Sequence, residues 1–173
     1  MKQNILRSVS IVFIAILLFS FINSEKWFKA GSAPTQYQMG PDDKNNEVFS
    51  IKSISTDLDE SSFGTYMTTE SPSKFIEKRV RLTGLVKSSI ETGWAGLWLR
   101  IDGKNRNETL GFDNMQNRPI VNSTDWTSYS IVLDIPSNAI SMSYGMLLAG
   151  KGQVWFKDVS IDIVEKNVPI TGL

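Results

Sequence analysis

The sequence contains no cysteine and no histidine, and its charges cancel, with 18 Lys and Arg against 18 Asp and Glu. The absence of cysteine excludes disulfides, thiol nucleophiles and a lipid attached to an N-terminal cysteine. The absence of histidine excludes every catalytic triad with an imidazole base, and the two absences together exclude zinc sites built on Cys and His. No Lys/Arg cluster interrupts the chain, so no nucleic-acid partner is expected.

Long apolar runs are scarce too, and the longest lies near the N-terminus. Lys2 and Arg7 precede an almost unbroken apolar run over residues 9–22, and the small Ser24 follows it. This run has the length of a signal-peptide core and falls short of the roughly 20 apolar residues of a full membrane span. Residues 1–24 are therefore predicted to form an apolar helix, as a cleaved signal peptide or a retained anchor, with a buried core helix as a third alternative. The protein is expected to be secreted or membrane-anchored outside the cytoplasm.

After this segment, apolar and polar residues alternate with the period of two that is typical of β-strands. The alternating segments are 48–54, 64–69, 80–87, 94–102, 126–135, 141–149 and 154–164. In the last of them the phase slips at Lys157-Asp158, which predicts a β-bulge. Residues 27–46 are predicted as a loop with at most a short strand at 37–39, and one helical turn is allowed at 71–77. About seven to nine strands favour an all-β antiparallel sandwich or jelly roll in a single domain, residues 25–173.

The segment 94–102, WAGLWLRID, is the most informative candidate binding element. If its Ala, Leu and Ile side chains face the core, then Trp94, Trp98 and Arg100 share the opposite face. Aromatic rings beside a charged side chain form a platform for a sugar ring or a peptide. The alternative is that both faces of this strand are covered and the tryptophans serve only packing.

A second candidate is the polar segment 113–119, in which Asp113, Asn114 and Arg118 offer acceptors and a guanidinium after a short strand. They are predicted to line the rim of the ligand site. The alternative is a structural loop, since Asp and Asn often bond nearby backbone groups in turns.

Oxygen ligands for a structural calcium ion are available in Asp42 and Asp158. These two would bring an early loop beside the last strand, and Asp43, Glu47 and Asp162 add further carboxylates. None of them follows the fixed spacing of a calcium-binding loop. No other cofactor is expected.

Several blocks resemble a bacterial module with a galactose-binding-like, carbohydrate-binding-like jelly-roll fold. They are GTYM (64–67), KRVRLTG (78–84), WAGLWLRID (94–102), GFDNM (111–115), TDWTSYSIVLDIP (124–136) and YGMLLAGKGQVWFKDVSIDIV (144–164). The resemblance spans roughly residues 27–172 and implies a jelly roll. In relatives this module stands alone or is fused to AraC-type transcription regulators or hydrolases. Where its closing strand carries paired acids, this chain has Lys157-Asp158, which weakens a metal site there.

Together these patterns favour a non-catalytic, extracytoplasmic binding module for a carbohydrate or another cell-envelope ligand. The first alternative is a membrane-tethered interaction domain or a sensor domain associated with a regulator. The second, less favoured, is a glycan hydrolase that uses two carboxylates, because no pattern in the sequence selects such a pair.

Overall fold

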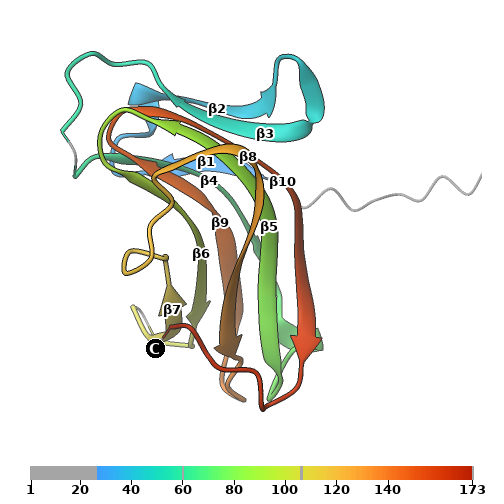
Figure 1. The fold of residues 1–173 in the computed structure, drawn as a ribbon. Helices are drawn as coiled ribbons and strands as arrows, with labels where there is room; N and C mark the ends of the chain where they lie inside the picture. Colours follow the sequence, from blue (N-terminus) through green and yellow to red (C-terminus); the bar gives the residue numbers. More distant parts are fainter. Residues whose placement is uncertain (1–26, 60, 106, 173) are drawn as a thin grey trace, which may run out of the picture.

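The computed structural model describes residues 27–59, 61–105 and 107–172 as two β-sheets packed face to face (Figure 1). The strands are β1 (Phe28–Gly31), β2 (Tyr37–Asp42), β3 (Asn45–Ser53), β4 (Phe63–Glu70), β5 (Arg79–Ile90), β6 (Trp94–Asp102), β7 (Thr109–Asp113), β8 (Asn122–Asp134), β9 (Ser141–Ala149) and β10 (Gly152–Val164). Two 3-10 turns, η1 (Pro34–Gln36) and η2 (Pro72–Lys74), join them. The helix predicted at 1–24 lies outside the described residues. Among those described, no helix is long and apolar enough to cross a membrane.

Each sheet has five antiparallel strands, which confirms the predicted β-sandwich. The first sheet has the order β1-β4-β9-β6-β7 and the second has the order β2-β3-β10-β5-β8. Consecutive strands therefore cross repeatedly from one sheet to the other, as they do in jelly-roll sandwiches. This arrangement leaves each sheet with one face on the core and one outer face.

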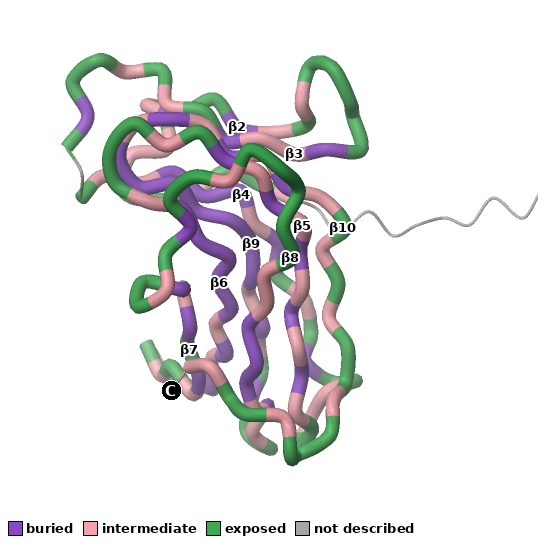
Figure 2. Tube along the Cα trace, in the orientation of Figure 1, coloured by how far each residue is buried: buried purple, intermediate pink, exposed green. Residues whose placement is uncertain are grey.

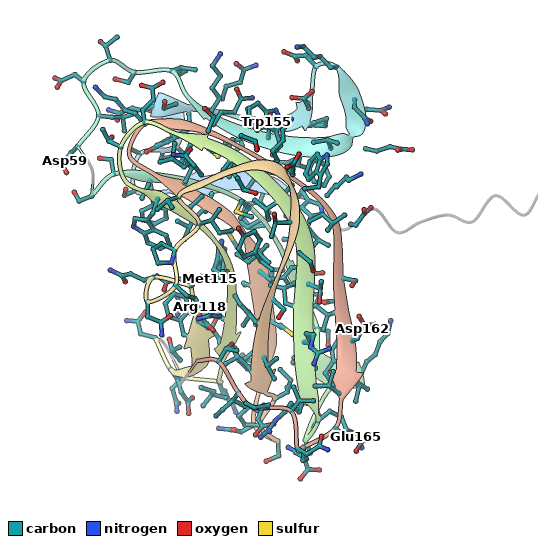
Figure 3. The ribbon with its side chains drawn as sticks, viewed as in Figure 1. Asp59, Met115, Arg118, Trp155, Asp162 and Glu165 are labelled. Atoms are coloured by element: carbon teal, nitrogen blue, oxygen red, sulfur yellow. The ribbon has the colours of Figure 1, made fainter. Side chains whose placement is uncertain are left out.

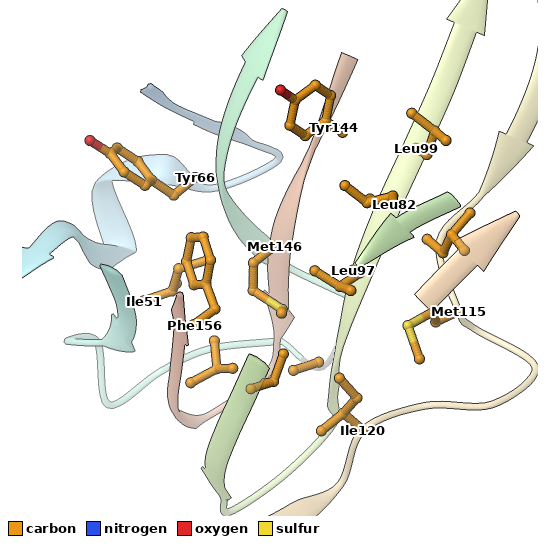
Figure 4. Close-up of a cluster of buried hydrophobic side chains, with 14 of the residues drawn as sticks. Ile51, Tyr66, Leu82, Leu97, Leu99, Met115, Ile120, Tyr144, Met146 and Phe156 are labelled. Atoms are coloured by element: carbon orange, nitrogen blue, oxygen red, sulfur yellow. The ribbon is translucent and has the colours of Figure 1, made fainter. Parts of the chain in front are cut away.

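The core lies between the sheets, and Figure 2 shows the buried positions following the central strands. The alternation predicted from the sequence is confirmed, since the inward residues of β6 and β9 have at most 4% exposure. These residues are Ala95, Leu97, Leu99, Ile101, Met142, Tyr144, Met146 and Leu148. Several of them meet Leu82, Ile51 and Phe156 of the second sheet in Figure 4. Strand periodicity thus sets the core directly.

Residues 27–46 contain more regular structure than predicted. The predicted strand at 37–39 extends to Asp42, and Phe28–Gly31 forms the edge strand β1 against β4. The Trp27 ring stacks on Tyr66 at a centroid distance of 5.6 Å and lies 5.1 Å from Phe49. The sequence pattern missed β1 because a short edge strand with mostly exposed residues shows no alternation.

The β-bulge predicted at Lys157-Asp158 is confirmed. Pairing between β10 and β5 shifts register between Lys157 and Ser160, and Asp158 takes a positive φ of 51°. The bulge absorbs one phase change, so Phe156 before it and Ile161 after it both pack toward the core.

Candidate functional site

A pocket of about 650 Å³ covers the outer face of the first sheet. We call it the Trp98 pocket. Its lining comes from β1, β4, β9, β6, β7 and the adjoining loops, and consists of Ala30, Gly31, Ser61, Phe63, Thr65, Met67, Trp94, Trp98, Arg100, Phe112, Asn114, Gln116, Leu147 and Ala149. Most of this lining is apolar, and several members form a hydrophobic cluster separate from the main core. An apolar cluster on the outer face of a sheet marks a candidate ligand surface.

The floor of the pocket depends on the way Trp98 lies across the sheet. Trp98 belongs to β6, and its indole N–H donates to the Thr65 hydroxyl on β4 at 2.8 Å. Strand β9 lies between those two strands, so the ring must cross it. Gly145 is the β9 residue paired with both Trp98 and Met67. A Cβ on Gly145 would lie 2.8 Å from the Met67 Cα, so the close approach of β4 to β9 at this row requires glycine.

Hydrogen bonds hold this ring in one orientation. The Thr65 hydroxyl donates to the Met146 carbonyl oxygen at 2.7 Å, so it accepts from the Trp98 indole. Trp98 is only 8% exposed. Its polar N–H is therefore used inside the protein, and its ring offers a ligand an apolar surface alone.

Trp94 and Phe112 supply more open aromatic surface around this floor. Trp94 is half-buried on β6, in the row that pairs with Ala149 of β9 and Phe63 of β4. Phe112 on β7 is 42% exposed and pairs with Arg100. The predicted shared face of Trp94, Trp98 and Arg100 is confirmed as a placement, while their role as ligand contacts stays a prediction.

Arg100 is the cation that lines the pocket. Its Nε donates to Asp102 at 2.7 Å, and its side chain remains 41% exposed. Because the carboxylate of Asp102 offsets its charge, Arg100 offers directional N–H donors more than a net positive field.

Two residues of the polar segment after β7, Asn114 and Gln116, line the Trp98 pocket. The Asn114 backbone approaches β6 so closely that a Cβ on Gly96 would lie 2.6 Å from the Asn114 carbonyl oxygen. Asn114 and Gln116 consequently overhang the Trp98 pocket and line it. The Asn114 side-chain oxygen accepts from the Gln116 backbone N–H at 3.1 Å, which stiffens this wall.

The predicted rim residues Asp113 and Arg118 lie elsewhere than in the lining of the Trp98 pocket. The Asp113 side chain is 4% exposed and pairs with the Arg118 guanidinium at 2.6 Å. It also accepts from the Thr171 hydroxyl at 2.6 Å and from the Met115 backbone N–H at 2.8 Å. Figure 3 shows Arg118 beside Met115 in this loop, and Figure 1 places the C-terminal segment next to β7. These contacts fasten the wall of the pocket to the C-terminal segment, which favours the structural alternative for this pair.

Burial by itself would raise the pKa of the Asp113 carboxyl group. The hydrogen bonds from Arg118, Thr171 and Met115 outweigh burial and hold this pKa below its ordinary value. Asp113 is therefore a charged, satisfied anchor at neutral pH.

The two residues predicted as calcium ligands have other surroundings. The Asp42 carboxylate accepts from the Trp155 indole N–H at 3.1 Å and from the Lys44 backbone N–H at 3.0 Å. Asp158 lies in the bulge, 4.0 Å from the Lys157 ammonium. Across the described part of the chain, no group of three or more Asp or Glu residues could hold a metal ion. The calcium site stays a prediction without geometric support.

The sequence pattern missed Thr65, Met67, Phe112, Gln116 and Leu147 as pocket residues. The strands that contain Thr65, Met67 and Leu147 could be predicted, and so could the face on which each lies, whereas Gln116 lies in the loop after β7. The pattern does not show which strands are neighbours in the sheet, because β4, β9 and β6 are adjacent in space and distant along the chain. Exposed Phe112 in a predicted strand was the one available signal.

Comparison with known proteins supports the architecture. No family model matches the chain. The Bacillus subtilis protein "Uncharacterized HTH-type transcriptional regulator YbfP" is 37% identical over 150 residues, which cover 85% of this chain and 50% of that protein. The chain thus spans about half the length of this relative.

Solved structures with the same fold include carbohydrate-binding modules. A CBM4 structure has a TM-score of 0.53 at 11% identity, covering 81% of this chain and 88% of that one. The CBM22-1 and GH10 modules of Clostridium thermocellum xylanase 10B, complexed with xylohexaose, give 0.52 at 13% identity, covering 84% and 27%. The enzymatically active domain of tailspike protein 4 from bacteriophage CBA120 gives 0.53 at 14% identity, covering 82% and 20%. At these identities the likeness shows the fold alone.

Proposed function

We propose that this chain is a non-catalytic module that binds a neutral carbohydrate in the Trp98 pocket and acts outside the cytoplasm. The observation that carries the proposal is the pocket itself, in which an immobilised indole forms an apolar floor beside Trp94 and Phe112. The apolar face of a sugar ring stacks on such rings, while Arg100 and Asn114 offer hydrogen bonds to its hydroxyl groups. The carbohydrate-binding modules among the fold neighbours support this ligand class.

The non-catalytic part of the proposal rests on the pocket chemistry. Glycosidases use two carboxyl groups roughly 5 to 10 Å apart. The described lining of the Trp98 pocket holds no Asp or Glu. We therefore expect the full chain to release no reducing ends from any oligosaccharide that it binds.

Calorimetric titration of the full chain with neutral oligosaccharides tests the ligand class. The panel contains xylohexaose and matched oligomers of glucose and of galactose. We expect one of them to bind, and Trp94→Ala to weaken its affinity at least about tenfold because a central aromatic contact is lost. Trp126→Ala, an exposed tryptophan on the second sheet, is the matched control and leaves this affinity unchanged. No binding by the whole panel, or equal losses in both variants, would contradict the proposal.

A regulator-associated sensor domain is the second candidate, and the similarity to a protein named as a transcriptional regulator favours it. The regular elements among the described residues are ten strands and two 3-10 turns, so no helix-turn-helix lies among them. Under this alternative, a retained N-terminal segment tethers the domain to a membrane. Mass spectrometry of the native protein discriminates: a mature N-terminus near residue 25 in the medium supports a free module, and the intact N-terminus in membrane fractions supports the tether.

A further inference from the structure

A second aromatic surface covers the outer face of the other sheet. Trp155 lies on β10 and Trp126 on β8, with β5 between them. The cavity beside them measures about 590 Å³ and extends under the β2–β3 hairpin. Trp126 is 38% exposed. Figure 3 shows Trp155 beside this hairpin, far from the Arg118 loop.

Lysine ammonium groups lie over both indoles, and we call this set the lysine–tryptophan face. Lys87 on β5 pairs with Trp155 in register, and its Nζ lies 4.9 Å from that ring and 5.9 Å from the Trp126 ring. Lys157 Nζ lies 5.0 Å from the Trp126 ring. Lys52 on β3 adds a further exposed cation to the cavity lining. A cation and the face of an aromatic ring attract each other, so Lys87 and Lys157 are held on the sheet.

Carboxylates also lie near this face. Asp42 ends β2 and Asp43 follows it in the turn to β3, and both line the same cavity as Lys87 and Lys52. Asp158 lies in the β10 bulge with its side chain 67% exposed. Asp42 already accepts from the Trp155 indole N–H at 3.1 Å, which orients that ring. The lysines and the indoles therefore occupy the strand surface from β3 to β8, while the carboxylates lie at the β2–β3 hairpin and at the bulge.

The cavity is open where a ligand would approach Trp155. Gly40 stands across from Ser50, which pairs with Trp155, so the three form one row over β2, β3 and β10. A Cβ on Gly40 would meet no atom within 4 Å. From β10 to β8 the face spans two strand spacings, about 9.5 Å, so an extended ligand can contact both tryptophans.

We propose that the lysine–tryptophan face is a second glycan site, and that it binds a linear polysaccharide with carboxylate-bearing sugar residues. The carboxylates pair with Lys87, Lys157 and Lys52, which draws the Lys87 and Lys157 ammonium groups off the indoles. The freed ring faces then stack on the apolar faces of the sugars. A neutral glycan gains no such pairing and must compete with the ammonium groups for the rings. This inference is independent of the neutral-glycan proposal, since it uses the opposite sheet.

Nuclear magnetic resonance of the five tryptophan indole N–H groups of the full chain tests the proposal. The probe is the tetramer of α-1,4-linked galacturonic acid, and its fully methyl-esterified form is the matched neutral control. We expect the acid to shift the Trp126 and Trp155 signals while the Trp94 and Trp98 signals stay in place. The ester shifts neither the Trp126 nor the Trp155 signal.

Substitutions at single lysines give the quantitative test. Lys87→Met keeps the length of the side chain and removes its charge, and it should weaken binding of the acid about fivefold. Lys104→Met, at an exposed lysine in the loop after β6, is the control and should bind as the unchanged protein does. Unmoved Trp94 and Trp98 signals in each variant show that the fold is intact.

Four outcomes would overturn the second site. They are no shift at Trp126 and Trp155, equal shifts by acid and ester, equal losses in the two lysine variants, and binding only to phosphatidylglycerol vesicles in a parallel sedimentation experiment. The last outcome would assign the face to an anionic membrane surface. None of them bears on the Trp98 pocket, whose neutral ligand is read from Trp94 and Trp98.

Discussion

The two outer faces of the sandwich use the same aromatic residue in opposite ways. In the Trp98 pocket the indole is 8% exposed, and its N–H is bound by Thr65. On the lysine–tryptophan face Trp126 is 38% exposed, and ammonium groups lie over its ring. The first face presents an apolar surface with balanced charge, and the second presents rings covered by cations. A tryptophan on a sheet face therefore indicates a ligand class only when the groups that its ring and its N–H already contact are taken into account.

Removing one tryptophan from each face should change the free energy of unfolding by very different amounts. Trp98→Ala removes a buried ring and leaves the Thr65 hydroxyl without its donor, so the free energy of unfolding should fall by about 3 kcal/mol. Trp126→Ala removes an exposed ring and should change it by less than about 1 kcal/mol. Urea denaturation measures both. Similar losses of unfolding free energy in the two variants would show that both tryptophans contribute equally to stability, which would contradict the contrast between the faces.

Asp113 anchors the wall of the Trp98 pocket, and its removal should have the second largest effect on stability. Asp113→Ala removes the carboxylate that pairs with the Arg118 guanidinium and accepts from the Thr171 hydroxyl, so the free energy of unfolding should fall by roughly 2 to 3 kcal/mol. Asp113→Asn, which keeps the shape of the side chain, should lose less. Because the pKa of Asp113 is lowered in the folded state, the contribution of its charge is present above the ordinary carboxyl pKa and is lost as pH falls below it. Urea titrations of wild type and Asp113→Asn should therefore converge in acid, and a constant difference at all pH values would refute the charged anchor.

Arg100→Met tests whether the Trp98 pocket recognises its ligand by hydrogen bonds or by charge. We expect affinity for the neutral oligosaccharide to fall about fivefold, the value of one hydrogen bond of about 1 kcal/mol. Increasing NaCl should leave the wild-type affinity nearly constant because Asp102 offsets the Arg100 charge. A steep salt dependence in calorimetry would assign this pocket an anionic ligand as well and would remove the contrast between the faces.

The smallest effect concerns an ion pair on the outer face of the second sheet. Hydrogen bonds from Arg79, and then from Lys166, lower the pKa of Asp134 from 3.8 to about 2. Because the pKa of Asp134 is lower in the folded state than in the unfolded state, its charge stabilises the fold above about pH 4. That stability disappears as pH falls from 3.8 toward 2. The Asp134 side chain is 43% exposed, so Asp134→Asn should cost less than about 1 kcal/mol at neutral pH after solvent screening. Thermal unfolding of wild type and Asp134→Asn at pH 7 and at pH 2.5 measures this difference in stability. A larger difference at pH 2.5 than at pH 7 would contradict a lowered pKa of Asp134 in the folded state.

Much of the sandwich could be read from periodicity, and the exceptions have physical causes. Strands β6 and β9 have the predicted bounds because one side of each is fully buried, which forces strict alternation. The edge strand β1 was not predicted. It pairs with β4 alone and its residues are mostly exposed, so its sequence does not need to alternate. For the candidate site, the common face of Trp94, Trp98 and Arg100 followed from the pleat. The separate position of Asp113 and Arg118 did not, because the path of a loop depends on partners such as Thr171.

The alternation of apolar and polar residues was sufficient to predict the two-sheet class, the inward and outward faces of the main strands and the bulge at Lys157-Asp158. These are local properties, since the pleat ties each side chain to its neighbours two residues away. Which outward residues meet depends on the order of the strands in each sheet, which local patterns do not contain. Trp98 reaches Thr65 across β9, and Lys87 comes between Trp155 and Trp126, because sheet order brings together strands that are far apart in the chain. Both candidate binding faces arise from that order.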